Sequence, residues 1–240
     1  DAPAPLVELM RQIETQPLWL DPKLLDLAHL TFRRSAFIGD WVLIQVSLMG
    51  GYRHEGVIQP LLYTGRLREY AVKRMADTSQ FLIHVTEKNA LNTGDIGYRA
   101  AVQVRLLHAH IRYYLNREES WSDADWGSPI NQADLAGTNL LFSLSFLTAS
   151  RIMGMRFTDR ESRSIIHLWR YVGHLMGIED ALLPSNEEEA RRIFYLVGMT
   201  QTPAGEEAAT LGRALHEVPI QRATGPLSRL KARGEMRMRA

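Results

Sequence analysis

His108 is the side chain of this sequence whose type and position most directly suggest chemistry. It belongs to the segment VRLLHAHIRYYL, residues 104–115. Apolar residues recur there at steps of three and four, which places them with His108 on one face of an amphipathic helix: Ala101, Val104, Ile111 and Leu115. An imidazole on such a face either forms ordinary hydrogen bonds inside the core or offers a neutral nitrogen to a ligand.

Two arginines flank His108 on adjoining turns. Arg105 precedes it by three positions and Arg112 follows it by four, so all three side chains lie along the same side of the predicted helix. The sequence therefore predicts a site that combines one neutral nitrogen with two guanidinium groups.

The segment RLREYAVKRMADTSQFLIHV, residues 66–85, carries a second set of polar side chains on an apolar helix face. We expect Arg74, Asp77 and Thr78 to lie on the buried side, which is marked by Leu67, Tyr70, Ala71, Phe81, Leu82 and Val85. Burying them is costly unless each is paired, so this face either closes an ion pair between Arg74 and Asp77 or lines a polar cavity. Together the two helices would supply an axial nitrogen for the iron of a porphyrin and cationic partners for its carboxylates.

The elements that must position these residues are predicted to be helices. Long segments of helical period are separated by short clusters of Gly, Pro, Ser and Asp, which indicates an all-α chain. Capping boxes are expected where Glu follows Ser or Thr by three positions, and glycines are expected to end the two helices that follow: Thr158 with Glu161, Ser185 with Glu188, Gly177 and Gly198. Residues 135–155 are apolar enough for a membrane span, but Asn139 and Arg151 favour a central buried helix.

Composition sets wider bounds. The 240 residues are 45% hydrophobic, which suits one helical domain over 1–218 followed by a basic tail over 219–240. A formal net charge of +1 gives no field that would attract nucleic acid, while the tail is either solvated or a membrane-surface contact. No cysteine is present, so disulfides, thiolate catalysis and cysteine-ligated metal or haem are excluded. The chain starts at Asp1. We expect a domain that is either cytoplasmic or secreted, with any targeting segment outside this chain.

The order and spacing of four motifs resemble the catalytic domain of the latex clearing protein or rubber oxygenase family, which includes farnesyl-chain-cleaving oxygenases. The motifs are Arg74-x-x-x-Thr78, Arg105-x-x-His108, WGSPINQADLAGT at 126–138 and HLWRYVGHLMGIEDALLP at 167–184. The resemblance implies a single-domain helical bundle with a globin-like core that holds haem b without a covalent bond, wedged between the two helices described above. It also implies an enzyme that uses O₂ to cleave a carbon–carbon double bond of an apolar, isoprenoid-like small molecule.

By this resemblance His108 is the axial ligand of the haem iron. Arg105, Arg112 and Thr138 would contact the cofactor, and Arg74, Asp77 and Thr78 would form the catalytic, oxygen-binding side. Trp126, Pro129 and Asn131 are expected to shape the turn into the central helix, and His167 and His174 to pack or to hydrogen-bond.

Two positions depart from the rubber-cleaving members of the family. Asp77 stands where they carry a basic residue, and Ile58 stands where they carry a glutamate, with Glu55 close by. We expect Asp77 to pair with Arg74 and to leave the sixth position of the iron open, with little cleavage of rubber. A haem-binding sensor without catalysis and a helical interaction protein without haem are the alternative functions.

Overall fold

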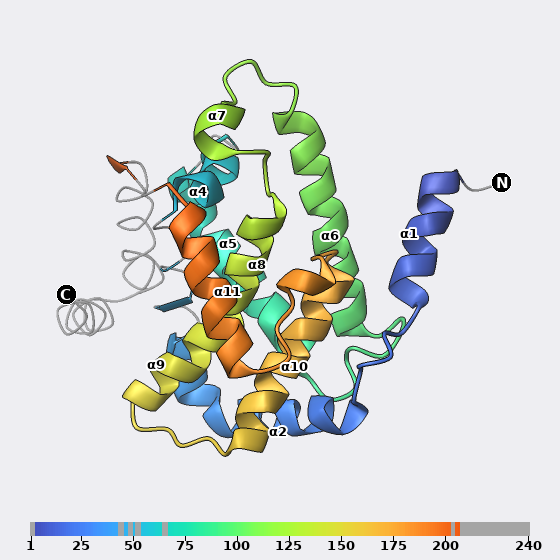
Figure 1. The fold of residues 1–240 in the computed structure, drawn as a ribbon, viewed down its shortest axis with the longest axis vertical. Coiled ribbons are helices and arrows are strands. Elements are labelled where there is room, and N and C mark those ends of the chain that lie inside the picture. Colours follow the sequence, from blue (N-terminus) through green and yellow to red (C-terminus); the bar gives the residue numbers. More distant parts are fainter. Residues whose placement is uncertain are drawn as a thin grey trace.

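The fold is that of an all-α protein, as the periodicity predicts. The structure is a computed structural model that describes residues 3–42, 46–47, 50, 54–63, 67–202 and 205–206, and their side chains except those of 36–41, 67–72 and 74–75. Across these ranges the chain forms helices joined by turns (Figure 1). The one β-bridge residue there is His54, in an isolated bridge. The basic tail and the expected boundary at residue 218 lie outside the described residues.

The helices follow one another through short connections. The α-helices are α1 (Ala4–Glu14), α2 (Pro22–Val42), α4 (Glu55–Leu62), α5 (Leu67–Thr86), α6 (Ile96–Leu115), α7 (Asp123–Trp126), α8 (Gln132–Leu140), α9 (Phe146–Ile152), α10 (Asp159–Leu175) and α11 (Glu187–Thr200). A π-helical turn, η2 (Leu141–Ser145), joins α8 to α9, and a 3₁₀ turn, η3 (Asp180–Leu182), follows α10.

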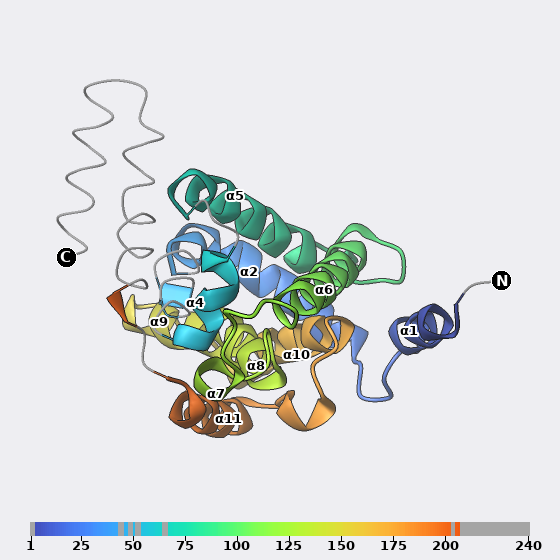
Figure 2. The same cartoon turned by 90° about the horizontal axis from the view of Figure 1, so that it is seen from above.

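Helix α10 forms the centre of the core. It packs most extensively on α2 and also contacts α6, α8 and α11 (Figures 1 and 2). Trp169 and Tyr171 of α10 are almost fully buried, and Phe142 stacks on Trp169 with ring centroids 5.2 Å apart. These large apolar and aromatic contacts supply most of the hydrophobic stabilisation of the fold.

The apolar segment 135–155 is a buried helical run, which confirms the interpretation as a central helix. It consists of the end of α8, then η2 and α9, and most of its side chains are buried. Asn139 donates from Nδ2 to the carbonyl of Trp169 at 3.1 Å, so this polar side chain ties α8 to α10. Arg151 pairs with Glu187 at 2.6 Å. Among the described helices, none is both long and apolar enough to cross a membrane.

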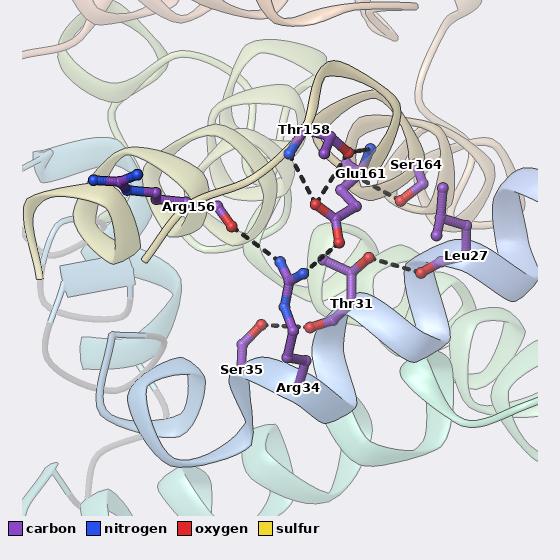
Figure 3. A network of polar contacts seen from close by, with 8 residues as sticks. All are labelled: Leu27, Thr31, Arg34, Ser35, Arg156, Thr158, Glu161 and Ser164. Carbon is purple, nitrogen blue, oxygen red and sulfur yellow. Dashed lines mark hydrogen bonds and ion pairs between the residues drawn. The ribbon is translucent and has the colours of Figure 1, made fainter. Parts of the chain in front are cut away.

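The start of α10 is fixed by the predicted capping box. Thr158 accepts a hydrogen bond from the Glu161 backbone, and Glu161 accepts one from the Thr158 backbone. Figure 3 shows how Arg34 of α2 joins this cap, because its guanidinium lies 2.5 Å from Glu161 Oε1 and donates to the carbonyl of Arg156 at 3.1 Å. The cap therefore also anchors α2 to α10.

Two of the other predicted helix signals are displaced. Gly177 follows α10 with a φ of +82°, as expected for a glycine beyond a helix end. The N-cap of α11, however, is Asn186, which accepts from the backbone of Glu189, whereas Ser185 lies one residue earlier and donates to the Glu189 carboxylate. Gly198 does not end α11, which continues to Thr200. The predictions for Ser185 and Gly198 were therefore wrong.

Candidate functional site

His108 lies on the face of α6 that the periodicity predicted. Tyr98, Ala101 and Leu115 are buried on this face, and His108 between them is half-buried with its Nδ1 atom shielded from solvent. The neighbouring His110 is exposed and packs edge-on against Tyr114. The geometry of the helix thus distinguishes the two histidines.

The two arginines beside His108 are half-buried and already contact the protein. Arg112 donates from Nε to the carbonyl of Pro129 at 3.1 Å and from Nη2 to that of Ile130 at 2.7 Å. Ile130 has a φ of +51°, which is strained for a β-branched residue, so Arg112 holds a strained turn in front of α8. Arg105 donates to Gln12 Oε1 at 3.0 Å, and burial lowers its pKa.

Helices α5 and α6 touch at the end where they are connected. A Cβ atom on Gly97 would lie 2.5 Å from the carbonyl oxygen of His84 and 3.0 Å from Cα of Val85. The two helices run antiparallel and rise by the same length per residue. Counting equal numbers of residues from the contact between Val85 and Gly97 therefore places Thr78 level with Val104, and Arg74 level with His108. The close contact at Gly97 therefore leaves no room for a ligand between α5 and α6 at that end.

The predicted polar face of α5 is partly corrected. Thr78 is half-buried on the same stripe as Leu82 and Val85, but Asp77 is exposed. Successive residues in an α-helix are rotated by 100°, so the position before Thr78 turns toward the solvent. The expectation of a buried Asp77 was therefore wrong. The side chain of Arg74 lies outside the described residues, as does its expected ion pair with Asp77.

Helix α4 places Ile58 in the core, whereas Glu55 is half-buried. Ile58 is fully buried. Glu55 accepts from Gln59 Nε2 at 2.7 Å and from the backbone N–H of Gly205 at 2.9 Å. These contacts attach α4 to the segment that follows α11, and they leave Glu55 in a structural role.

Thr138 lines an apolar pocket that the sequence did not predict. The pocket has a volume of about 380 Å³ and lies between α8 with η2, α11 and α4. Its apolar wall comes from side chains far apart in the sequence: Val57, Leu141, Leu144, Phe194 and Val197. The Asn131-x-x-Asp134 pattern is the one feature of the sequence that could have indicated it. This pattern forms a capping box at the start of α8 and places Asp134 on the pocket wall.

Asp134 is the acidic group of this pocket. Its side chain is buried, and it accepts from Gln201 Nε2 at 3.2 Å and from the backbone of Asn131 at 3.3 Å. Burial raises the pKa of the Asp134 carboxyl, and the two hydrogen bonds partly oppose this shift. A desolvated carboxyl group at the end of an apolar pocket is a typical feature of a binding site.

The candidate residues thus form two groups. The first is the strip of Arg105, His108 and Arg112 on α6, which faces α10 and the turn before α8. The second is the pocket with Thr138 and Asp134 on the α11 side of α8. Helix α8 contacts both α10 and α11, so it lies next to both groups.

The residues around His108 fit a haem b. A half-buried imidazole can supply the single axial nitrogen that such a haem needs, and the flanking guanidinium groups suit its carboxylates. The sequence lacks cysteine, as a haem held without thioether bonds allows. Within the part of the chain that the structure describes, no group of three or more His, Asp or Glu side chains is placed to hold a bare metal ion.

Two histidines of α10 serve the fold. His167 accepts through Nε2 from the backbone of Asp21 at 2.9 Å, and its ring packs edge-on against Trp19. His174 stacks on Tyr171 and lies 3.7 Å from Asp180. His167 therefore packs and hydrogen-bonds, and His174 packs beside an acidic residue, as expected from the sequence.

We expect these two histidines to make the protein sensitive to mild acid. Burial lowers the pKa of His167 and of His174 below the ordinary value of 6.5. The unfolded chain then binds more protons, so stability is full above pH 6.5 and falls as the pH drops from there toward the folded pKa values, by about 1.4 kcal/mol per pH unit for each histidine. Melting temperatures of the wild type and of His167→Gln between pH 8 and pH 5 measure this. Equal slopes for the two proteins would contradict the role of His167.

Comparison with known proteins places this arrangement in a family. Residues 20–239 match the family described as "ER-bound oxygenase mpaB/B'/Rubber oxygenase, catalytic domain". A rubber oxygenase from a Streptomyces species is 23% identical over 213 residues, which cover 85% of this chain and 51% of that protein. The chain thus spans about half the length of this curated relative.

A solved structure of latex clearing protein in the closed state has the same fold. It matches with a TM-score of 0.82 at 19% identity, over 99% of this chain and 64% of the solved one. Because the family match extends over most of its length, the chain belongs to the catalytic-domain family of the mpaB/B' and rubber oxygenases.

Proposed function

We propose that this protein is a haem b-dependent oxygenase that uses O₂ to cleave a carbon–carbon double bond of an apolar, isoprenoid-like substrate. The observation that carries the proposal is the half-buried His108 between Arg105 and Arg112, in a chain that belongs to an oxygenase family. The Streptomyces relative is named a rubber oxygenase, and we extend an activity of this type to the present chain as part of the proposal.

His108 is the residue that would hold the cofactor. Its shielded Nδ1 atom suits a role in fixing the ring while Nε2 serves as the ligand, a division of labour common among ligating histidines. Arg105 and Arg112 lie one turn away on either side, at positions suited to the carboxylates of a porphyrin. When bound, haem iron supplies the redox chemistry that activates O₂.

The remaining residues would bind, orient and exclude water. Thr78 is half-buried on the stripe of α5 that also carries Leu82 and Val85, and its hydroxyl could donate a hydrogen bond to a bound ligand. Thr138 brings a second hydroxyl to the wall of the apolar pocket. Leu141 and Phe194 of that pocket provide a dry surface for an apolar substrate. The exposed Asp77 has no place in this arrangement.

The hydroxyl of Thr78 provides the test of this proposal. With an isoprenoid alkene, Thr78→Val should lower O₂ consumption about fivefold, because the loss of one well-placed hydrogen bond amounts to about 1 kcal/mol. Thr78→Ser should keep most of the activity. The matched control is Thr86→Val on the same helix, whose hydroxyl donates to the Leu82 carbonyl at 2.7 Å and should affect melting alone.

Both rates and melting temperatures are needed to decide between site and core. If Thr78→Val keeps wild-type O₂ consumption and loses only melting temperature, Thr78 is a core residue. If the wild type consumes no O₂ with any alkene, the oxygenase function itself is wrong.

A further inference from the structure

The apolar pocket is elongated, and its length follows from the register of α8 and α11. Gly137 approaches Val197, since a Cβ atom on Gly137 would lie 3.1 Å from Val197 Cγ1, and Asp134 contacts Gln201. The sequence numbers rise on one helix as they fall on the other, so these neighbouring helices run antiparallel (Figures 1 and 2). Arg191, which also lines the pocket, lies about 15 Å from Gln201 at 1.5 Å per residue along α11.

The middle of the pocket is kept open by glycine. Phe194 and Gly198 follow Arg191 at steps of three and four, so these three residues form one stripe of α11 facing the pocket, and Gln201 lines the pocket directly after the helix ends. Among the described residues, no atom lies within 4 Å of the place that a Cβ atom on Gly198 would take. Glycine inside a helix costs about 1 kcal/mol relative to alanine. The open space at Gly198 is thus maintained at the expense of helix stability.

The two ends of the pocket differ in charge and in access to solvent. At one end Asp134 is buried, and Gly56 of α4 closes over it, since a Cβ atom there would lie 3.9 Å from Asp134 Oδ1. At the other end Arg191 is exposed and lies 3.3 Å from Glu187, which reduces its pull on an anion. A ligand therefore meets an acceptor group at the closed end and apolar walls along its length.

Asp134 selects the head group of such a ligand. Each carboxylate oxygen accepts one hydrogen bond, from Gln201 or from the backbone of Asn131, and has a further lone pair. A hydroxyl group can donate to this lone pair. A carboxylate head group would be repelled, and a plain hydrocarbon would desolvate Asp134 without a new hydrogen bond in return.

We infer that this pocket binds a single medium-length aliphatic alcohol, with its hydroxyl group at Asp134 and its chain along α8 and α11 past Thr138. If the bound alcohol is the substrate, the inference rests on the proposed oxygenase function, because Thr138 would then face the chain to be cleaved. As a statement about binding it does not require turnover.

Calorimetric titration of the purified chain with saturated probes tests the inference. Decan-1-ol should bind at least tenfold more tightly than decanoate. Asp134→Asn removes the negative charge with little change in shape, and it should bring the two affinities to within about threefold by strengthening the binding of decanoate. Gly198→Leu fills the pocket and should weaken decan-1-ol at least tenfold. Leu196→Ala is the control on the same helix, because Leu196 is exposed and does not line the pocket, and it should bind as the wild type does.

The outcomes separate this inference from the proposed function. Decanoate binding as tightly as decan-1-ol, or unchanged affinity in Gly198→Leu, overturns the pocket assignment. Because both probes are saturated and no O₂ is consumed, a negative result here leaves the oxygenase proposal standing. Conversely, a protein that binds decan-1-ol as expected but contains no haem would keep the pocket and lose the oxygenase.

Discussion

His108→Ala is expected to yield a folded protein without stoichiometric haem. The imidazole is half-buried on α6, and Ala at this position removes the proposed axial nitrogen while preserving helix propensity. We expect bound haem to fall at least tenfold, measured as haem per chain after gel filtration, with little change in far-ultraviolet circular dichroism. His110→Ala, two positions away on the exposed side, is the control and should retain the wild-type haem content.

A chemical rescue distinguishes loss of the ligand from loss of the fold. His108→Gly leaves a space that free imidazole can enter, so added imidazole should restore a haem spectrum close to that of the wild type. His108→Ala protein with a full and unshifted haem spectrum would show that another residue binds the iron.

Gly97→Ala should destabilise the protein by about 3 kcal/mol, because the added methyl group has no room and overpacking of this kind is costly. Its Cβ atom would lie 2.5 Å from the His84 carbonyl oxygen and 3.0 Å from the Ala90 carbonyl oxygen. Both atoms are backbone atoms that no side-chain rotation can move, so α5 and α6 must separate. Denaturant unfolding monitored by circular dichroism measures the loss.

Gly198→Ala serves as the control for the same chemical change in open space. Because a Cβ atom there meets no described residue within 4 Å, this variant should gain up to about 1 kcal/mol from helix propensity. A Gly97→Ala protein as stable as the wild type would mean that α5 and α6 do not touch at this point, and that the relative level of Arg74 and His108 derived from this contact is wrong.

Much of the fold and part of the site follow from local sequence patterns. The periodicity of residues 101–115 placed His108 correctly, because the period of a helix is fixed by its hydrogen bonding. The Thr158 cap was found for a similar reason, since it depends on residues three positions apart. The prediction for Asp77 was wrong because Asp77 directly precedes the stripe residue Thr78, and the 100° rotation between successive residues decides which of the two is exposed.

The features that the sequence did not reveal depend on contacts between distant segments. The pocket joins Asp134 to Gln201, and no local pattern indicates that α11 returns to cover α8. Gly198 was assigned to a helix end because glycine usually breaks helices, whereas here it lies in a helix and opens a pocket. The partners of Arg112 are likewise backbone carbonyls of a strained turn that only the folded chain forms.

The absorption spectrum of the purified wild-type chain in the Soret region tests the central claim most directly. Protein produced with an ample haem supply should show a Soret band that corresponds to about one haem per chain, and His108→Ala should lack it. A well-folded wild-type chain that shows no Soret band after incubation with haem would contradict the assignment of a haem-dependent oxygenase.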